Sequence, residues 1–118
     1  MSNCCDNKKE KKLKFLDKDI KYFYVNGCHA WLDGIKELHD TLIEEGFKPK
    51  FEVVCITTEQ EAIENKFCGS PAIQIGGIDV DKMAKYVKNY SMASCRPYHF
   101  EGKSFEFPPK GMIKKLLK

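Results

Sequence analysis

The sequence predicts an α/β domain: a mixed four-stranded sheet with flanking helices and an inserted helix and hairpin before the last helix. Two observations lead to this prediction. Apolar runs of strand length alternate with stretches in which apolar residues recur at helical spacing. A Gly76-Gly77 pair between two short apolar runs is typical of a β-hairpin turn. The alternation implies a parallel strand pair, and the hairpin an antiparallel one, with helices on both faces of the sheet.

The first half of the domain is predicted to be a β-α-β unit. Residues 20–25 form a β-branched and aromatic run and are the expected first strand. Apolar residues then recur at helical spacing over residues 31–43, and Gly46 follows them where helices favour glycine. We therefore expect an amphipathic helix that begins near residues 28–30. Residues 51–56 are the expected second strand.

The next elements follow from capping and turn signals. Thr58 and Glu61 have the spacing of a capping box, which predicts a short helix to about residue 67. Residues 72–75 and 78–80 flank the glycine pair and are predicted as the third and fourth strands.

The insert and the last helix complete the expected order. Residues 81–90 carry spaced apolar side chains and are predicted as an extra helix. Residues 98–107 are predicted as a second hairpin, turning at Glu101-Gly102. A short closing helix is expected over residues 112–117.

The 118 residues favour one domain. Residues 1–19 are mostly polar and charged, so we predict a mobile arm there, followed by a single domain over residues 20–118. The net charge of +3 arises from the two ends of the chain rather than from its body. A nucleic-acid-binding protein more often carries its positive charge as a stripe on the folded body, so we do not expect nucleic acid as a partner.

Cysteine usage predicts reduced thiols. Six cysteines in 118 residues lie below the share of about 8–10% that marks a disulfide scaffold. The first residues lack the apolar stretch of a signal peptide, and no apolar run is long enough to span a membrane. We therefore expect a cytoplasmic protein with no membrane partner. Cysteines kept in that reducing compartment are more often catalytic or metal-binding than structural.

Cys28 is the first candidate for chemistry. It lies between the first strand and the first helix, beside His29. The free N–H groups and the positive end of a helix dipole favour a thiolate over a thiol at such a position. A half-buried cysteine that packs as a small apolar side chain is an equally simple interpretation from the local sequence.

Two segments together resemble a known fold family. Residues 28–31, Cys-His-Ala-Trp, follow the first strand, and residues 69–73, Gly-Ser-Pro-Ala-Ile, precede the Gly-Gly hairpin. This arrangement resembles the thioredoxin-like fold, over residues 20–80 and with residues 108–118 as the last helix. The resemblance implies that the Ser70-Pro71 bond is cis and that its loop faces Cys28.

A closer resemblance rests on four short segments. They are Cys-x-x-Trp at residues 28–31, Phe-Cys-Gly-Ser-Pro at 67–71, Asp-Val-Asp at 79–81 and Cys-Arg-Pro-Tyr at 95–98. Together they are similar to a group of small microbial thioredoxin-like proteins of uncertain function, some of them in mercury-resistance or alkylmercury-lyase-like contexts.

The resemblance implies thiol–disulfide exchange through Cys28, although the second cysteine of the family's Cys-x-x-Cys is here Trp31. A partner thiol must then come from elsewhere, and Cys68 and Cys95 are the candidates. Pro71 would shape a groove for an extended substrate. The residues expected to line that groove are His29, Trp31, Ser70 and Tyr98. The implied partner is a thiol-containing protein or a small thiol, and no cofactor is expected.

Two alternatives remain open from the sequence. In the first, Cys4, Cys5 and Cys28 bind a soft metal ion such as Hg(II), Cu(I) or an arsenic species. In the second, the cysteines are inert and the domain is an interaction module. Zinc is disfavoured because no cysteine pair has the usual spacing of structural zinc ligands.

The other residues of these types are predicted to have structural roles. Cys55 is expected in the core, His39 on the surface, and His99 as a side chain of the second hairpin. Asp79 and Asp81 are interpreted as turn residues. A Ser-His-Asp order, a Walker loop and a GxGxxG segment are absent from the sequence, which disfavours hydrolase and nucleotide-binding functions.

Overall fold

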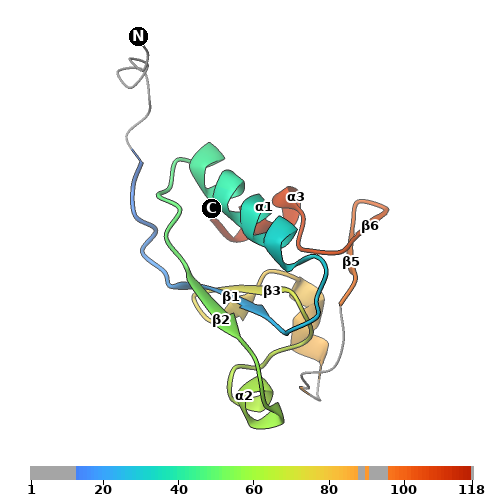
Figure 1. Ribbon diagram of the computed structural model, residues 1–118. Coiled ribbons are helices and arrows are strands. Elements are labelled where there is room, and N and C mark those ends of the chain that lie inside the picture. Colours follow the sequence, from blue (N-terminus) through green and yellow to red (C-terminus); the bar gives the residue numbers. More distant parts are fainter. Residues whose placement is uncertain (1–12, 88–89, 91–95, 118) are drawn as a thin grey trace.

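The computed structural model describes residues 13–87, 90 and 96–117. Its helices and strands follow one another in an order that agrees with the sequence prediction (Figure 1). They are β1 (Ile20–Tyr24), α1 (Trp31–Glu44), β2 (Glu52–Cys55), α2 (Glu59–Glu64), β3 (Ala72–Ile75), β4 (Ile78–Asp79), the 3₁₀ helix η2 (Lys82–Tyr86), β5 (Tyr98–Phe100), β6 (Lys103–Phe105) and α3 (Lys110–Leu117).

The main sheet has the strand order β2-β1-β3-β4. The β1–β2 pair is parallel, with Tyr22 opposite Val53, and β1 pairs antiparallel with β3, with Tyr22 opposite Ile73. The β3–β4 pair is the antiparallel hairpin that turns at the two glycines. The predicted α/β class and its mixed four-stranded sheet are therefore confirmed, and the arrangement is compatible with a thioredoxin-like fold.

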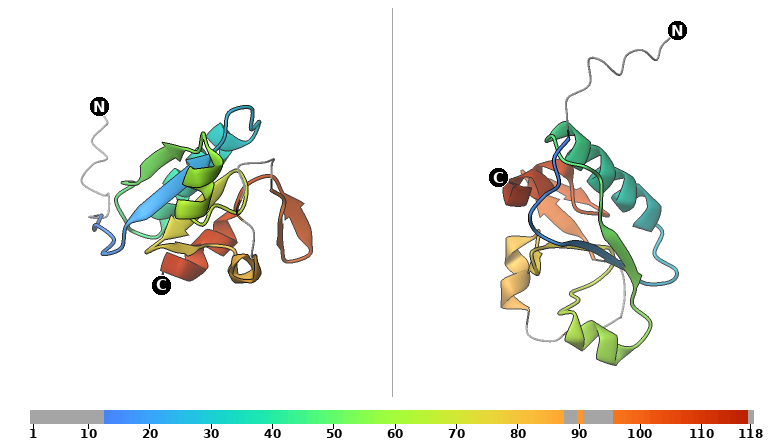
Figure 2. Two further views of the ribbon diagram at one scale, coloured as in Figure 1. Left: turned by 90° about the horizontal axis from the view of Figure 1, so that it is seen from below. Right: turned by 90° about the vertical axis from the view of Figure 1, so that its left-hand side faces the viewer.

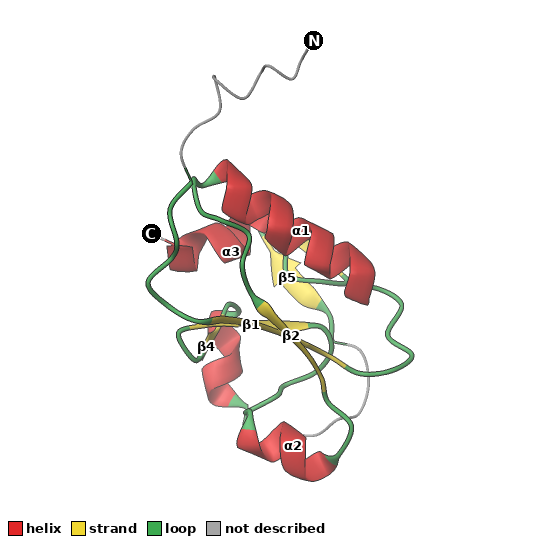
Figure 3. Cartoon of the chain, turned by 60° about the vertical axis from the view of Figure 1, so that its left-hand side comes forward, coloured by secondary structure: helices red, strands yellow, loops and turns green. Residues whose placement is uncertain are grey.

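Helices cover both faces of this sheet. Neighbouring side chains of a strand point to opposite faces, so the apolar residues of β1 contribute to a core on each side. Tyr22 packs in one core cluster with Leu38 of α1 and Ile113 of α3. Phe23, the next residue, packs in a second cluster with Ala62 of α2 and with Phe67. Figure 3 shows α1 and α3 on one side of the strands and α2 on the other.

The insert contains the predicted hairpin but not the predicted extra helix. Strands β5 and β6 pair antiparallel and turn at Glu101-Gly102, where both residues have positive φ angles. Instead of a helix over residues 81–90 there is the short 3₁₀ helix η2. The Asp81 side chain accepts a hydrogen bond from the Met83 amide at its start, and Val87 at its end has extended backbone angles.

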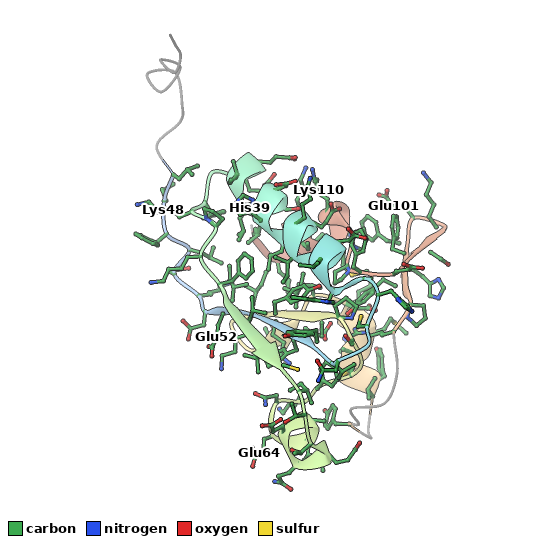
Figure 4. The ribbon with its side chains drawn as sticks, in the orientation of Figure 1. His39, Lys48, Glu52, Glu64, Glu101 and Lys110 are labelled. Atoms are coloured by element: carbon green, nitrogen blue, oxygen red, sulfur yellow. The ribbon has the colours of Figure 1, made fainter. Side chains whose placement is uncertain are left out.

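Two helix boundaries differ from the prediction for local reasons. Helix α2 has the predicted Thr58 cap but ends at Glu64, because Asn65 is its C-cap and Lys66 has a positive φ of 53°. Helix α3 begins at Lys110, two residues earlier than expected. The Lys110 amide donates a hydrogen bond to a carboxylate oxygen of Glu37 at 2.9 Å, which ties the start of α3 to α1 (Figure 4).

The predicted arm falls partly within the described residues. Lys14 forms a parallel bridge with Phe47: its amide donates to the Gly46 carbonyl at 3.0 Å, and its carbonyl accepts from the Lys48 amide at 2.8 Å. Leu16 packs against the first core cluster. Contact with the domain therefore begins before residue 20. Residues 1–12 lie outside the described part.

The prediction that Cys55 is a core residue is wrong, because β2 is an edge strand (Figure 2). Val53 is 43% exposed and Cys55 is only half-buried. The β-branched composition of this run indicated a strand but carried no information about which strand lies at the edge. Among the described helices, none has the length and apolarity needed to span a membrane.

Gly34 marks a close approach between α1 and β1. The Tyr22 hydroxyl donates a hydrogen bond to the Trp31 carbonyl at 2.7 Å, directly beneath the helix. A Cβ on Gly34 would lie 2.1 Å from the Tyr22 hydroxyl oxygen and 3.2 Å from Cβ of Phe107. The helix can therefore pack this closely on the sheet only with a glycine at this position.

We expect Gly34→Ala to destabilise the protein, although alanine is favoured over glycine in a helix by about 1 kcal/mol. Overpacking of this kind costs about 1–3 kcal/mol or more and outweighs that preference. The measurement is the free energy of unfolding in urea. Lys36→Ala, at an exposed position of the same helix, should change it by less than about 0.5 kcal/mol.

Tyr22→Phe provides a second arm of the same test, because it removes the oxygen that the new methyl group would meet. The double variant should be less destabilised than the sum of the two single variants. Strict additivity would contradict the contact as described.

Candidate functional site

A pocket of about 450 Å³ lies between the start of α1 and the β5–β6 hairpin. Its described lining residues come from two parts of the chain that are far apart in sequence. They are Cys28, His29 and Ala30 from the loop before α1, and Arg96, Pro97, Ser104, Phe105 and Glu106 from the insert.

Cys28 enters this pocket from a tight turn at the end of β1. Its amide donates a hydrogen bond to the Val25 carbonyl at 3.3 Å, and Gly27 supplies the positive φ of 89° that the turn needs. Cys28 is only 4% exposed, and its thiol makes no hydrogen bond among the described residues. A buried polar group without a partner therefore lines the pocket.

Helix α1 starts slightly later than the sequence suggested. Trp31 is its first residue and Ala30 its N-cap, which has no side-chain hydrogen bond to the helix. Cys28 therefore precedes the first helical residue by a short turn rather than standing in the helix itself.

The Ser70-Pro71 bond is cis, as the resemblance implied. The Ser70 hydroxyl accepts a hydrogen bond from the Val25 amide at 3.2 Å, which joins this loop to the end of β1, three residues before Cys28. Ser70 and Pro71 are both buried and are not among the described lining residues of the pocket. They support the end of β1, from which the Cys28 loop departs, rather than forming a wall of the pocket.

Arg96 fixes the insert to the main sheet. Its guanidinium makes two hydrogen bonds of 2.9 Å with the carboxylate of Asp79, at the end of β4, and lies 3.5 Å from Asp81. The side chains of Arg96 and Asp79 are only 10% and 8% exposed, so solvent screens this pair weakly. Burial disfavours the charged form of Arg96, but the hydrogen bonds with Asp79 and the charge interactions with Tyr98, Asp79 and Cys68 together outweigh it and raise the pKa of Arg96 above its usual value.

The backbone of the same segment holds the cis-proline loop. The Arg96 amide donates to the Ser70 carbonyl at 2.9 Å, and a Cβ on Gly69 would lie 2.8 Å from Cβ of Arg96. The Arg96 guanidinium lies 4.5 Å from the centre of the Tyr98 ring, and the Tyr98 hydroxyl donates to the Pro71 carbonyl. Tyr98 is fully buried, so it braces the loop instead of lining a groove.

Of the remaining predicted groove residues, one lines the pocket and the other does not. His29 is exposed and lines the pocket. Trp31 stacks on Tyr24, with ring centroids 4.5 Å apart and planes 11° from parallel, and is not among the described lining residues. Only His29 of the four therefore shares the pocket with Cys28.

Cys68 does not open onto the Cys28 pocket. It lines a second cavity of about 330 Å³, beside β4 and η2, and its thiol lies 3.6 Å from the Lys66 carbonyl, to which it donates. Burial and the carboxylate of Asp79 raise the pKa of the Cys68 thiol, and the nearby Arg96 offsets this only in part. A thiol with a raised pKa is a weak nucleophile at neutral pH.

The other predicted ligands and histidines are placed as follows. Cys4, Cys5 and Cys95 lie outside the described residues, and Cys28, Cys55 and Cys68 are free thiols. Within residues 13–87, 90 and 96–117 no group of three or more His, Cys, Asp or Glu side chains is arranged to hold a metal ion. His39 is exposed, as predicted, and His99 lies in β5 of the predicted hairpin.

Sequence reasoning missed the role of Arg96 and interpreted Asp79 and Asp81 as ordinary turn residues. One signal was present: Arg96 is the only arginine among the 20 lysine and arginine residues of the chain. An arginine provides a planar fork that binds a carboxylate through two hydrogen bonds, which a lysine cannot do.

The fold and the pocket define an α/β protein whose mixed sheet is compatible with a thioredoxin-like arrangement and which has a buried thiol on a small pocket. The chain belongs to the family described as Domain of unknown function (DUF2703), which matches residues 26–116. That match includes Cys28, the cis-proline loop and the hairpin that closes the pocket. Searches of curated proteins and of solved structures found no match to the chain.

We expect Arg96→Ala to destabilise the protein by about 3–5 kcal/mol, because it leaves the carboxylate of Asp79 buried without its partner. Arg96→Lys keeps the charge but loses one of the two parallel hydrogen bonds, so it should cost less, about 1–3 kcal/mol. Urea denaturation measures both values.

A double-mutant cycle with Asp79→Asn separates the pair from its surroundings. The double variant Arg96→Ala with Asp79→Asn should lose clearly less free energy of unfolding than the sum of the losses in the two single variants. Lys85→Ala, an exposed lysine of η2, is the control for removing one positive charge nearby. Additive losses would show that Arg96 and Asp79 do not act as a pair.

Proposed function

We propose that this protein carries out thiol–disulfide exchange, with Cys28 as the nucleophile and the substrate sulfur held in the adjacent pocket. The observation that carries the proposal is the Cys28 thiol itself: it is almost fully buried, makes no hydrogen bond with the described residues and lines a pocket of about 450 Å³. A space of this size can hold a small ligand beside the sulfur.

The proposed reaction balances without a cofactor. The Cys28 thiolate attacks one sulfur of a substrate disulfide, a Cys28–substrate disulfide forms, and the substrate's own disulfide bond breaks. The departing sulfur leaves with the electron pair and takes up a proton from solvent. A second thiolate then attacks the mixed disulfide and releases the substrate thiol.

The surroundings of Cys28 support the first step. The first turn of α1 begins three residues after Cys28, and free amides at a helix start stabilise negative charge. The apolar side chains of Ala30, Pro97 and Phe105 form much of the pocket wall. Exchange needs a disulfide held within reach of the Cys28 sulfur, and the pocket provides the space for it.

Cys95 is the better candidate for the second thiol. Cys68 lines a different cavity, and its raised pKa keeps it protonated at neutral pH. Cys95 lies outside the described residues, but it is the sequence neighbour of Arg96, which lines the Cys28 pocket. The proposal therefore uses Cys28 and Cys95, with an external thiol restoring both to the reduced state.

We expect a neutral disulfide, bis(2-hydroxyethyl) disulfide, to modify Cys28 first, as mapped by peptide mass spectrometry. Cys28→Ser should abolish the reaction at this site. Cys95→Ser should accumulate the Cys28 mixed disulfide, because the second attack is lost, whereas Cys68→Ser should behave as the unmodified protein.

Cys55→Ser is the matched control, because Cys55 is a half-buried thiol on the edge strand and belongs to no step. If Cys28 stays unmodified in the folded protein while Cys55 reacts, the exchange function is wrong and an interaction module explains the fold better. If Cys68→Ser traps the mixed disulfide instead, the second thiol has been assigned incorrectly.

A further inference from the structure

The charge around the Cys28 pocket is not what its residue types first suggest. Arg96 and His29 are the basic side chains among its described lining residues, and Glu106 is the acidic one. Taken at face value, an arginine beside the nucleophile would attract anionic substrates. The partners of Arg96 reverse that expectation.

The positive charge of Arg96 is offset by two carboxylates at the end of β4 and just after it. Both of its terminal nitrogens bind Asp79, and one also lies 3.5 Å from Asp81. One guanidinium between two carboxylates leaves the cluster with a net charge of about −1 when all three groups are ionised. Of these three residues only Arg96 is among the described lining residues of the pocket, and its positive charge is offset by two carboxylates, of which Asp79 lines the Cys68 cavity.

Glu106 adds to this negative charge. Glu106 is exposed, follows β6 and lines the pocket. It makes no ion pair with a basic side chain of the described residues. The sequence of residues 91–95, which precedes Arg96, contains no charged side chain. Among the described lining residues, His29 is the one basic side chain that is not paired with a carboxylate.

We propose that the Cys28 pocket selects neutral and cationic disulfides over anionic ones. A cationic example is a disulfide whose cysteine lies next to a lysine or a free amine. This proposal rests on the proposed exchange function and names its substrate class. It also runs against the field of the whole molecule, because the chain has a net charge of +3, which by itself favours anionic reagents. Local and overall charge therefore predict opposite preferences.

Three small disulfides of similar skeleton test the proposal: cystamine, bis(2-hydroxyethyl) disulfide and 3,3′-dithiodipropionate, which are cationic, neutral and anionic. The rate at which each forms a mixed disulfide with Cys28 of the full chain is measured by mass spectrometry. Each rate is divided by that of 2-mercaptoethanol with the same reagent, which removes differences in intrinsic reactivity.

We expect the normalised rate for cystamine to exceed that for 3,3′-dithiodipropionate by about 5-fold at 10 mM salt, where the Debye length is about 30 Å. At 0.5 M salt, screening should reduce the ratio to about 2-fold or less. A ratio at or below one at low salt overturns the proposed selectivity while leaving the exchange function standing. If none of the three reagents modifies Cys28, the exchange function itself fails, and the selectivity with it.

Two variants decide whether the preference arises in the pocket. Glu106→Gln removes a charge from the lining and should reduce the low-salt ratio by about half. Glu52→Gln removes the same charge from the start of β2, opposite Lys21 and at the far end of β1 from Cys28 (Figure 4). Glu52→Gln should leave the ratio unchanged. Equal reductions in both variants would assign the preference to overall charge and overturn the pocket as its source.

Discussion

The pairing of Arg96 with Asp79 is the interaction on which the candidate site depends. It joins two segments 17 residues apart, one at the end of the main sheet and one at the start of the inserted hairpin. Because the pair is buried, breaking one partner leaves an uncompensated charge in a poorly solvated place. The side-chain anchor also fixes the Arg96 backbone, whose amide bonds the Ser70 carbonyl. The inserted segment, the cis-proline loop and the end of β1 are therefore held as one unit.

That unit explains why a pocket exists beside Cys28. The main sheet supplies only one wall, the loop between β1 and α1, and the hairpin supplies the other. Tyr98 braces the hairpin from behind by donating to the Pro71 carbonyl. Arg96 holds the hairpin wall of the pocket in place, and the carboxylate of Asp79 neutralises its charge. Its role is therefore structural, and Cys28 is the residue proposed to react. An arginine near a nucleophile is thus not by itself an anion site, because its partners decide the sign of the local charge.

The opposite side of the domain is fixed by packing rather than by charge. Gly34 lets α1 approach Tyr22 of β1, and the Glu37 carboxylate receives the first amide of α3. These contacts set the position of α1, and hence of the loop before it that carries Cys28. The thiol is positioned from one side by close helix–sheet packing and from the other by a buried ion pair.

The sequence by itself determined the order of elements, the parallel and antiparallel strand pairs, the Thr58 cap, the hairpin at Glu101-Gly102 and the position of Cys28 before the first helix. These features depend on spacing between near neighbours, and periodicity reports such spacing directly. The tertiary structure alone decided that β2 lies at the edge and leaves Cys55 half-exposed, that Cys68 and Cys28 open onto different cavities, and that Tyr98 is a buried brace. It also decided that Arg96 binds Asp79. Each of these depends on contacts between residues distant in sequence, whose geometry is set only when the sheet, the loop and the insert pack together, and local patterns carry no record of it.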